Sequence, residues 1–216
     1  MIRGVLFDMD GLMFDTERIG FDGWKAAGRT LGVTIPDGVI HAMRGTGVAE
    51  SRAIFNRALA GVVDYDEARA LRVQYADEEI AAHGLPVKTG LRELLQHLKN
   101  AGIPAAVASS TPIERVMDYL RQTRIETCFS AFVCGTQVPR AKPEPDIFLA
   151  AAAALNLPAR ECLVLEDSPN GLRAARAANC KAVVVPDLTP APSPSEKLWD
   201  AKAATLLDVI PLLERL

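Results

Sequence analysis

Two aspartates near the start of the chain have the type and spacing of catalytic or metal-binding carboxylates. Asp8 and Asp10 directly follow the apolar residues 4–7, and Gly11 then lets the backbone bend close to a ligand. Two negative charges this close repel one another, so the pair requires a cation or a raised pKa. Mg²⁺ takes hard oxygen ligands and is often held by one or two carboxylates. The pair therefore indicates a magnesium site, although a solvated turn after a strand would show the same sequence.

Three further polar motifs each follow another apolar run. Ser109 and Ser110 precede a helical pattern, where a hydroxyl and free amides can bind an anion or simply cap the helix. Lys142 follows the next run, where a lysine can meet a phosphate as a point charge or lie in solvent. Glu166 and Asp167 end the most apolar run, where they could bind a metal or only complement a helix dipole. Taken singly, none of these motifs decides between its two interpretations.

The elements that carry these motifs follow from the pattern of apolar residues. Short, continuously apolar runs are typical of strands buried on both faces, and helical patterns separate them along the chain. Such alternation predicts an α/β fold, with a Rossmann-like parallel sheet and helices on both faces. A last helix is expected at about 207–215, after a Pro/Ser loop at 189–195. The other expected elements are strands at 4–7, 104–108, 131–134, 162–165 and 182–185, and helices at 89–101, 112–122, 145–156 and 168–178.

The order of these elements brings the polar motifs to one place. Each motif lies at the carboxyl end of a different expected strand, and ligands bind at that edge of open α/β sheets. Acids, a lysine, a hydroxyl and helix amides would then converge on one point. Together with a divalent cation, such a set makes a phosphoryl-transfer site. The combination therefore favours phosphoryl transfer over four unrelated turns and caps.

One segment interrupts the alternation of strands and helices. Residues 15–84 contain no convincing strand, and glycines divide them into several helical patterns. We therefore predict two domains, a core of residues 1–14 and 85–216 that carries the motifs and a helical insertion of residues 15–84. The four helices of the insertion are expected at 17–31, 37–43, 48–60 and 64–82.

The composition argues against several classes of protein. The 216 residues carry a net charge of −3, so the basic excess typical of nucleic-acid binding is missing. The four cysteines lack C-x-x-C spacing and a histidine cluster, which favours reduced core thiols over a zinc site. No apolar run approaches the length of a membrane span, and no secretory leader is evident. We expect a cytoplasmic protein, a monomer or weak homodimer, that binds neither nucleic acid nor membrane.

Together, the motifs resemble those of the haloacid dehalogenase-like hydrolase superfamily. Motif order, spacing and strand context agree, and the similarity covers essentially the whole chain. Residues 14–17 and 142–148 are similar to the beta-phosphoglucomutase and sugar-phosphatase branch, which carries a four-helix cap after its first motif. The resemblance thus implies that residues 15–84 are the cap and that residues 1–14 and 85–216 are the catalytic core. The motif residues are Asp8, Asp10, Gly11, Ser109, Lys142, Pro143, Glu166 and Asp167.

The resemblance implies catalytic roles for the two aspartates of the first motif. Asp8 would attack phosphorus and form an aspartyl-phosphate. Asp10 would protonate the leaving alcohol and then deprotonate the water that hydrolyses the intermediate. Within this superfamily a second acid distinguishes phosphoryl transfer from dehalogenation, so Asp10 argues against a dehalogenase.

The resemblance also implies how the phosphoryl group and the metal would be held. The hydroxyl of Ser109 and the amide of Ser110 would bind phosphoryl oxygens. Lys142 would neutralise charge on both the nucleophile and the phosphoryl group. Glu166 would lie beside the metal or bind it through water. The implied ligands of Mg²⁺ are Asp8, the backbone carbonyl of Asp10, and Asp167.

The same active site could serve a hydrolase or a mutase. Beta-phosphoglucomutases have a His on the first cap helix, and they grip a second phosphate with an Arg and a Lys of the cap. At the matching positions this chain has Gly20, Val48 and Ala76. These departures favour a phosphatase of small phosphorylated metabolites, sugar phosphates first, although Arg44 and Arg52 could substitute. A phosphosugar mutase is the first alternative, and a catalytically silent phosphate-binding protein is the second. Cap residues that could contact substrate are Trp24, Lys25, Arg44, Gly45 and Thr46, with cap core as the alternative for Trp24 and solvent for Lys25.

Overall fold

The computed structural model describes all residues 1–216, and the chain divides into two compact units. The first unit comprises Met1–Phe14 and Val87–Leu216, and the second comprises Asp15–Pro86. The sequence-based boundary after residue 84 falls slightly before Pro86. The assignment of the two units as core domain and cap domain remains a prediction.

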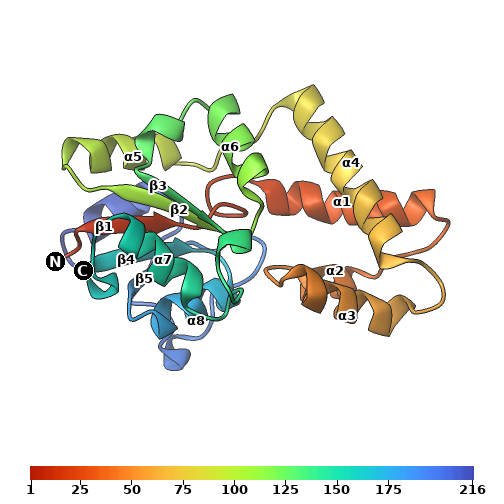
Figure 1. Ribbon diagram of the computed structural model, residues 1–216. Coiled ribbons are helices and arrows are strands. Elements are labelled where there is room, and N and C mark those ends of the chain that lie inside the picture. The colour runs from red at the N-terminus through yellow and green to blue at the C-terminus, as the bar shows by residue number, and fades with distance from the viewer. The chain divides into compact units, whose positions relative to one another are not determined.

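The first unit is built on a six-stranded sheet with the strand order β3-β2-β1-β4-β5-β6 (Figure 1). All neighbouring strands in this order are parallel. The predicted α/β fold with a parallel sheet is therefore confirmed. The strands are β1 Gly4–Phe7, β2 Ala105–Ser109, β3 Ala131–Cys134, β4 Cys162–Glu166, β5 Lys181–Val184 and β6 Ala201–Lys202.

Helices cover both faces of this sheet, α7 and α8 on one and α5 and α6 on the other (Figure 1). On the first face, Leu6 of β1 shares a buried cluster with Phe148 of α7 and Leu172 of α8. On the opposite face, Phe7 meets Phe129 edge to face, with ring centroids 5.6 Å apart. Burial on both faces explains why the strands are continuously apolar. These helices are α5 Leu91–Asn100, α6 Ile113–Gln122, α7 Asp146–Ala154 and α8 Pro169–Ala177.

The carboxyl-terminal region differs from the sequence-based expectation in two respects. The sixth strand, β6, was not predicted, because two residues are too few to form a recognisable apolar pattern. The helix expected at about 207–215 is instead a 3-10 helix, η5, over Leu207–Leu212. Pro211 lies inside it and has no amide hydrogen for an α-helical hydrogen bond, which explains the change.

The second unit consists of four helices with a small apolar core of their own. Trp24 on the first helix packs against Phe55 and Tyr65, with ring centroids 5.7 and 6.0 Å away. None of the helices of the chain combines the length and apolar character that a membrane span requires. The helices of this unit are α1 Thr16–Thr30, α2 Asp37–Met43, α3 Val48–Leu59 and α4 Tyr65–His83.

Candidate active site

The sheet order creates a switch point at β1. This strand pairs with β2 on one side and with β4 on the other, so the chain leaves β1 towards one edge and later returns to its other flank. Open α/β sheets bind their ligands beyond the carboxyl ends of the strands at such a point. The four polar motifs of the sequence all follow strands that end there, namely β1, β2, β3 and β4.

The first motif forms a tight loop at the end of β1. The amide of Asp8 still bonds to the carbonyl of Leu165 in β4, at 3.1 Å, which fixes this residue to the sheet. Gly11 then adopts a φ of 81°, a left-handed conformation that favours glycine. Its amide bonds back to the carbonyl of Phe14 at 2.9 Å and closes the loop. Asp8 is consequently buried at the sheet edge, whereas Asp10 is half-buried.

Lys142 lies inside the protein, and its ammonium group is surrounded by acceptors. The Nζ atom is 2.5 Å from Oδ1 of Asp8 and 2.7 Å from Oε1 of Glu166. A third bond reaches the carbonyl of Ala108, at 3.2 Å, and the ring of Phe148 lies 4.8 Å away. Lys142 is only 7% exposed. The interpretation as a solvated loop lysine is therefore wrong.

Three buried carboxylates converge beside this lysine. Asp8, Glu166 and Asp167 each offer an oxygen atom, and these atoms lie within 4.8 Å of one another. Glu166 is the last residue of β4, so pairing of β4 with β1 brings Asp167 next to Asp8. Hard, closely spaced carboxylate oxygens are the donor set that Mg²⁺ prefers. The residues therefore fit a divalent cation.

The charges of the cluster are unbalanced. Burial raises the pKa of Asp8 to about 8, and repulsion from Glu166 and Asp10 adds to this effect, although Lys142 opposes it. Burial alone would lower the pKa of Lys142, but the attraction of Asp8 and Glu166 outweighs it and raises this pKa. One lysine thus faces three buried acids. A divalent cation would restore neutrality and favour the ionised form of Asp8.

The second motif presents Ser109 at the end of β2. Ser109 is buried, and its Oγ accepts a bond from the amide of Thr111 at 3.1 Å. Ser110 follows and is exposed. The Thr111 hydroxyl donates to Oδ2 of Asp10 at 2.6 Å, a contact that no sequence pattern predicts. A threonine before a helix is equally suited to capping, so only the packing of the two loops reveals this contact.

The candidate substrate residues of the second unit have separate environments. Trp24 is 8% exposed within the apolar core, which supports the alternative that it is a packing residue. Lys25 forms an ion pair with Asp37 and lies over the ring of Phe21, 5.7 Å from its centroid. These contacts occupy Lys25 within its own unit.

Arg44, Gly45 and Thr46 form the turn between α2 and α3. The Nε atom of Arg44 lies 3.5 Å from a carboxylate oxygen of Glu17. The hydroxyl of Thr46 donates to the carbonyl of Met43 at 2.7 Å and lies 2.7 Å from Oγ of Ser51. Contacts with α1, α2 and α3 therefore anchor the turn.

Gly20, the position that matches the mutase histidine, lies against α4. A Cβ atom added at Gly20 would lie 2.3 Å from Nη2 of Arg72. The guanidinium of Arg72 thus occupies the space that a side chain at position 20 would need. Its Nε atom is buried and has no hydrogen-bond partner. The other two mutase positions hold Val48, which is exposed, and Ala76, which is buried.

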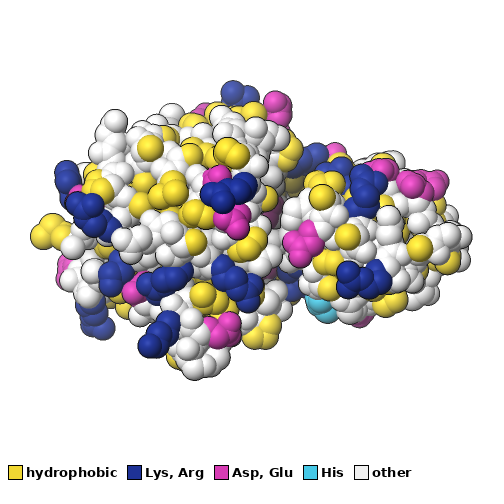
Figure 2. Space-filling view, turned by 60° about the horizontal axis from the view of Figure 1, so that its bottom comes forward, with side chains coloured by type: hydrophobic (Ala, Val, Ile, Leu, Met, Phe, Trp, Pro, Cys, Tyr) yellow, Lys and Arg dark blue, Asp and Glu magenta, His cyan; other side chains and the backbone are white.

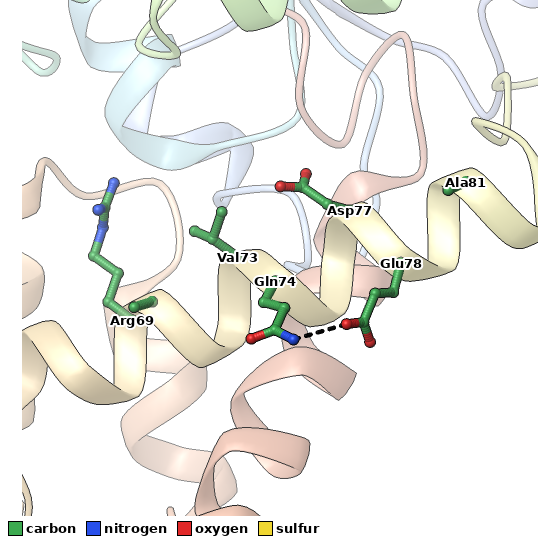
Figure 3. Close-up of a pocket in the computed structure, with 7 residues that line it drawn as sticks. Arg69, Val73, Gln74, Asp77, Glu78 and Ala81 are labelled. Carbon is green, nitrogen blue, oxygen red and sulfur yellow. Dashed lines mark hydrogen bonds between the residues drawn. The ribbon is translucent and has the colours of Figure 1, made fainter.

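One face of the molecule and one hollow on α4 lie outside the motif residues. Lys and Arg side chains are scattered over the face shown in Figure 2, with acidic side chains between them. A shallow hollow runs along one side of α4, where Nε2 of Gln74 donates to Oε1 of Glu78 at 2.8 Å (Figure 3). Its residues come from one helix and include none of the motif residues. They are Arg69, Ala70, Val73, Gln74, Asp77, Glu78 and Ala81.

Comparison with known proteins relates this geometry to one family. Residues 2–179 match the family of haloacid dehalogenase-like hydrolases. A phosphorylated carbohydrates phosphatase of Thermotoga maritima is 30% identical over 84% of this chain and 84% of its own length. Hexitol phosphatase A of Escherichia coli is 31% identical over 85% of this chain and 82% of its own length.

A solved structure agrees with these sequence relatives. It shows a mutant of CbbY from Rhodobacter sphaeroides in complex with xylulose-1,5-bisphosphate, and its TM-score against this chain is 0.82. The two proteins are 26% identical, and the match covers 97% of this chain and 96% of CbbY. The solved structure shares the fold of this chain, and its bound ligand is a sugar bisphosphate. The names of the two sequence relatives refer to phosphatases of carbohydrates and hexitols.

Proposed function

Because the chain belongs to the haloacid dehalogenase-like hydrolases, we propose that it is a Mg²⁺-dependent phosphomonoesterase that acts through an aspartyl-phosphate. One observation carries the proposal. Lys142 is buried between Asp8 and Glu166, directly beside a cluster of carboxylate oxygens that fits a divalent cation. A nucleophile, a fixed positive charge and a metal-binding donor set are the parts that phosphoryl transfer requires.

The proposed reaction has two steps, and Asp10 transfers one proton in each of them. In the first step a carboxylate oxygen of Asp8 bonds to phosphorus, and the bond to the leaving oxygen breaks while Asp10 donates a proton to it. In the second step Asp10 takes a proton from a water molecule, which attacks phosphorus and releases Asp8 and inorganic phosphate. The half-buried position of Asp10 suits a group that meets both an alcohol and water.

The other motif residues bind and neutralise charge. The hydroxyl of Ser109 and the amide of Ser110 hold phosphoryl oxygens, and Lys142 offsets charge on the nucleophile and the phosphoryl group. Bound Mg²⁺ supplies positive charge that stabilises the phosphoryl group during transfer. Its proposed ligands are Asp8, Asp167 and the carbonyl oxygen of Asp10.

The names of the relatives support a proposal for the substrate class. Their names refer to phosphorylated carbohydrates, hexitols and xylulose bisphosphate, so we propose a small sugar phosphate or sugar-alcohol phosphate as substrate. In the second unit, Trp24 is a packing residue of the apolar core, which makes it a poor candidate for substrate contact. Lys25 and Arg44 are each paired with an acid of the same unit, so neither is favoured over the other, and both stay candidates together with Gly45 and Thr46.

A phosphate-release screen with purified protein tests the proposal. We expect Mg²⁺-dependent release from at least one sugar or sugar-alcohol phosphate, and none after chelation by EDTA. Asp8→Asn should lose this activity, whereas Asp118→Asn should keep it, because Asp118 is an exposed residue of α6. No release from a broad panel of phosphorylated metabolites would contradict the proposal and favour a binding protein.

The mutase alternative is tested in the same assay with beta-glucose 1-phosphate and a bisphosphate activator. We expect free phosphate to form faster than glucose 6-phosphate, because Arg72 fills the space at Gly20 where a mutase carries its histidine. The opposite order of rates would identify a mutase.

A further inference from the structure

Both carboxylate oxygens of Glu166 are engaged by groups of the protein. Oε1 accepts a bond from Nζ of Lys142 at 2.7 Å. Oε2 accepts two bonds from Ser168, one from its amide and one from its hydroxyl, each 2.9 Å long. Glu166 is fully buried, so these contacts replace all of its hydration. A carboxylate held in this way is fixed in position and orients the lysine.

Ser168 connects this carboxylate to the first turn of α8. It is the N-cap residue of the helix, and its Oγ accepts a bond from the amide of Gly171 at 3.0 Å. The same hydroxyl donates its hydrogen to Oε2 of Glu166. A chain of hydrogen bonds therefore runs from Gly171 through Ser168 and Glu166 to Lys142, and ends at Asp8.

Gly171 provides the space in which the carboxylate lies. A Cβ atom added there would lie 1.6 Å from Oε1 of Glu166 and 1.9 Å from its Cδ, whereas ordinary contacts begin at 3.4 Å. Gly171 lies in the first turn of a helix and has no positive φ, so backbone conformation does not demand glycine here. Close approach of the Glu166 carboxylate is the reason that the structure offers for glycine at this position.

We propose that Gly171 and Ser168 are positioning residues for catalysis, which act by holding Glu166 so that it keeps the Lys142 ammonium against Asp8. The inference rests on the proposed roles of Asp8 and Lys142 in phosphoryl transfer. Any side chain at position 171 displaces the Glu166 carboxylate from its position beside Lys142. Lys142 then loses one of its two ionic partners and the direction of its contact with Asp8, so turnover falls while the fold is retained.

A double-mutant cycle between positions 166 and 171 tests the inference. Gly171→Ala should lower kcat at least about tenfold, with a smaller change in KM. Glu166→Asp should also lower kcat, because the shorter side chain recedes from Lys142. In the Glu166→Asp background, however, Gly171→Ala should cost less than about twofold, because the shorter acid leaves room for the added methyl group.

Three controls make the outcome decisive. Gly38→Ala lies in α2, where an added Cβ meets nothing within 4 Å, and it should leave kcat unchanged. Ser168→Thr keeps the hydroxyl and should retain more activity than Ser168→Ala. Circular dichroism and the melting temperature establish that each variant is folded. If Gly171→Ala fails to fold, the comparison of Ser168→Ala with Ser168→Thr tests the positioning of Glu166 without adding an atom at position 171.

The possible results separate this inference from the proposed function. An inactive wild-type protein would contradict the proposed function itself. An active wild-type protein with an equally active Gly171→Ala variant would overturn the inference alone. An equal loss from Gly171→Ala in the wild-type and Glu166→Asp backgrounds would also overturn it, because the effect would then not pass through Glu166.

Discussion

The hydroxyl of Thr111 fixes the direction of the Asp10 carboxylate through a 2.6 Å hydrogen bond. A general acid must point at the proton acceptor, so loss of this donor should slow turnover rather than weaken substrate binding. Thr111→Val preserves the shape of the side chain and removes the donor. We expect kcat to fall about fivefold, which corresponds to about 1 kcal/mol for one hydrogen bond.

Steady-state kinetics on any substrate found in the phosphate-release screen measures this effect. Thr111→Ser is the matched control, because it keeps the hydroxyl, and it should lie close to the wild type. A Thr111→Val variant with wild-type kcat would show that Asp10 is oriented by other contacts.

The sequence revealed the location of the motif residues better than their environment. Strand ends predicted that Asp8, Lys142 and Asp167 would share one edge of the sheet, because parallel strands place their carboxyl ends together. Burial of Lys142 could not be predicted, because loop position does not determine the direction of a side chain. The contact between Thr111 and Asp10 could not be predicted either, since it joins two loops that are distant in sequence.

At the scale of the elements, the two longest helices of the second unit approach closely where α1 carries glycines. A Cβ atom added at Gly23 would lie 2.9 Å from the backbone oxygen of Arg72 in α4. Gly23→Ala must therefore move one helix, whereas Gly20→Ala has to displace only the flexible end of the Arg72 side chain. We expect Gly23→Ala to lower the free energy of unfolding by about 1–3 kcal/mol.

Gly20→Ala should cost less, because only the flexible end of the Arg72 side chain has to move, and the preference of helices for alanine over glycine, about 1 kcal/mol, applies equally at both positions. Urea unfolding of both variants measures the difference, and hydrogen exchange over residues 16–83 shows whether α1 and α4 are the elements affected. Equal stability of the two variants would contradict close backbone packing at Gly23.

The bounds of an element were predictable where clear start and stop signals mark both of its ends. The strands β1 and β3 and the helix α2 have the predicted bounds, because apolar runs and helix-ending residues mark them clearly. The strand β6 and the 3-10 helix η5 could not be predicted, since β6 has only two residues and η5 contains a proline. β6 forms a strand through its pairing with β5, and the local sequence does not predict this tertiary contact.

At the scale of the whole molecule, the parallel sheet and the family were predictable, but the strand order was not. Alternation of strands and helices implies parallel pairing, and the motif order implied the haloacid dehalogenase-like hydrolases, which the family match confirms. The order β3-β2-β1-β4-β5-β6 depends on which side of β1 each crossover takes. Local patterns contain no information on that choice.

The buried acids of the site should make the stability of the metal-free protein depend on pH. Burial raises the pKa of Asp8 from 3.8 to about 8, so between these values the folded protein holds a proton that the unfolded chain releases. Relative to a protein with ionised Asp8, protonation of this side chain stabilises the folded state. The stabilisation is complete below pH 3.8 and is lost as the pH rises through about 8. Asp8→Asn removes the titrating group and keeps a neutral side chain of similar shape.

We therefore expect the wild type to lose stability relative to Asp8→Asn as the pH rises. The measured quantity is the free energy of unfolding of the variant minus that of the wild type, which should increase with pH. Urea unfolding in EDTA at pH 4.5 and pH 8.5 should show a change of more than about 1 kcal/mol, the equivalent of less than one pKa unit. Asp118→Asn serves as the control, and its difference from the wild type should not change in the same direction. A difference that is constant or falls with pH would show that Asp8 is already ionised in the metal-free protein, with Lys142 alone sufficient to balance it.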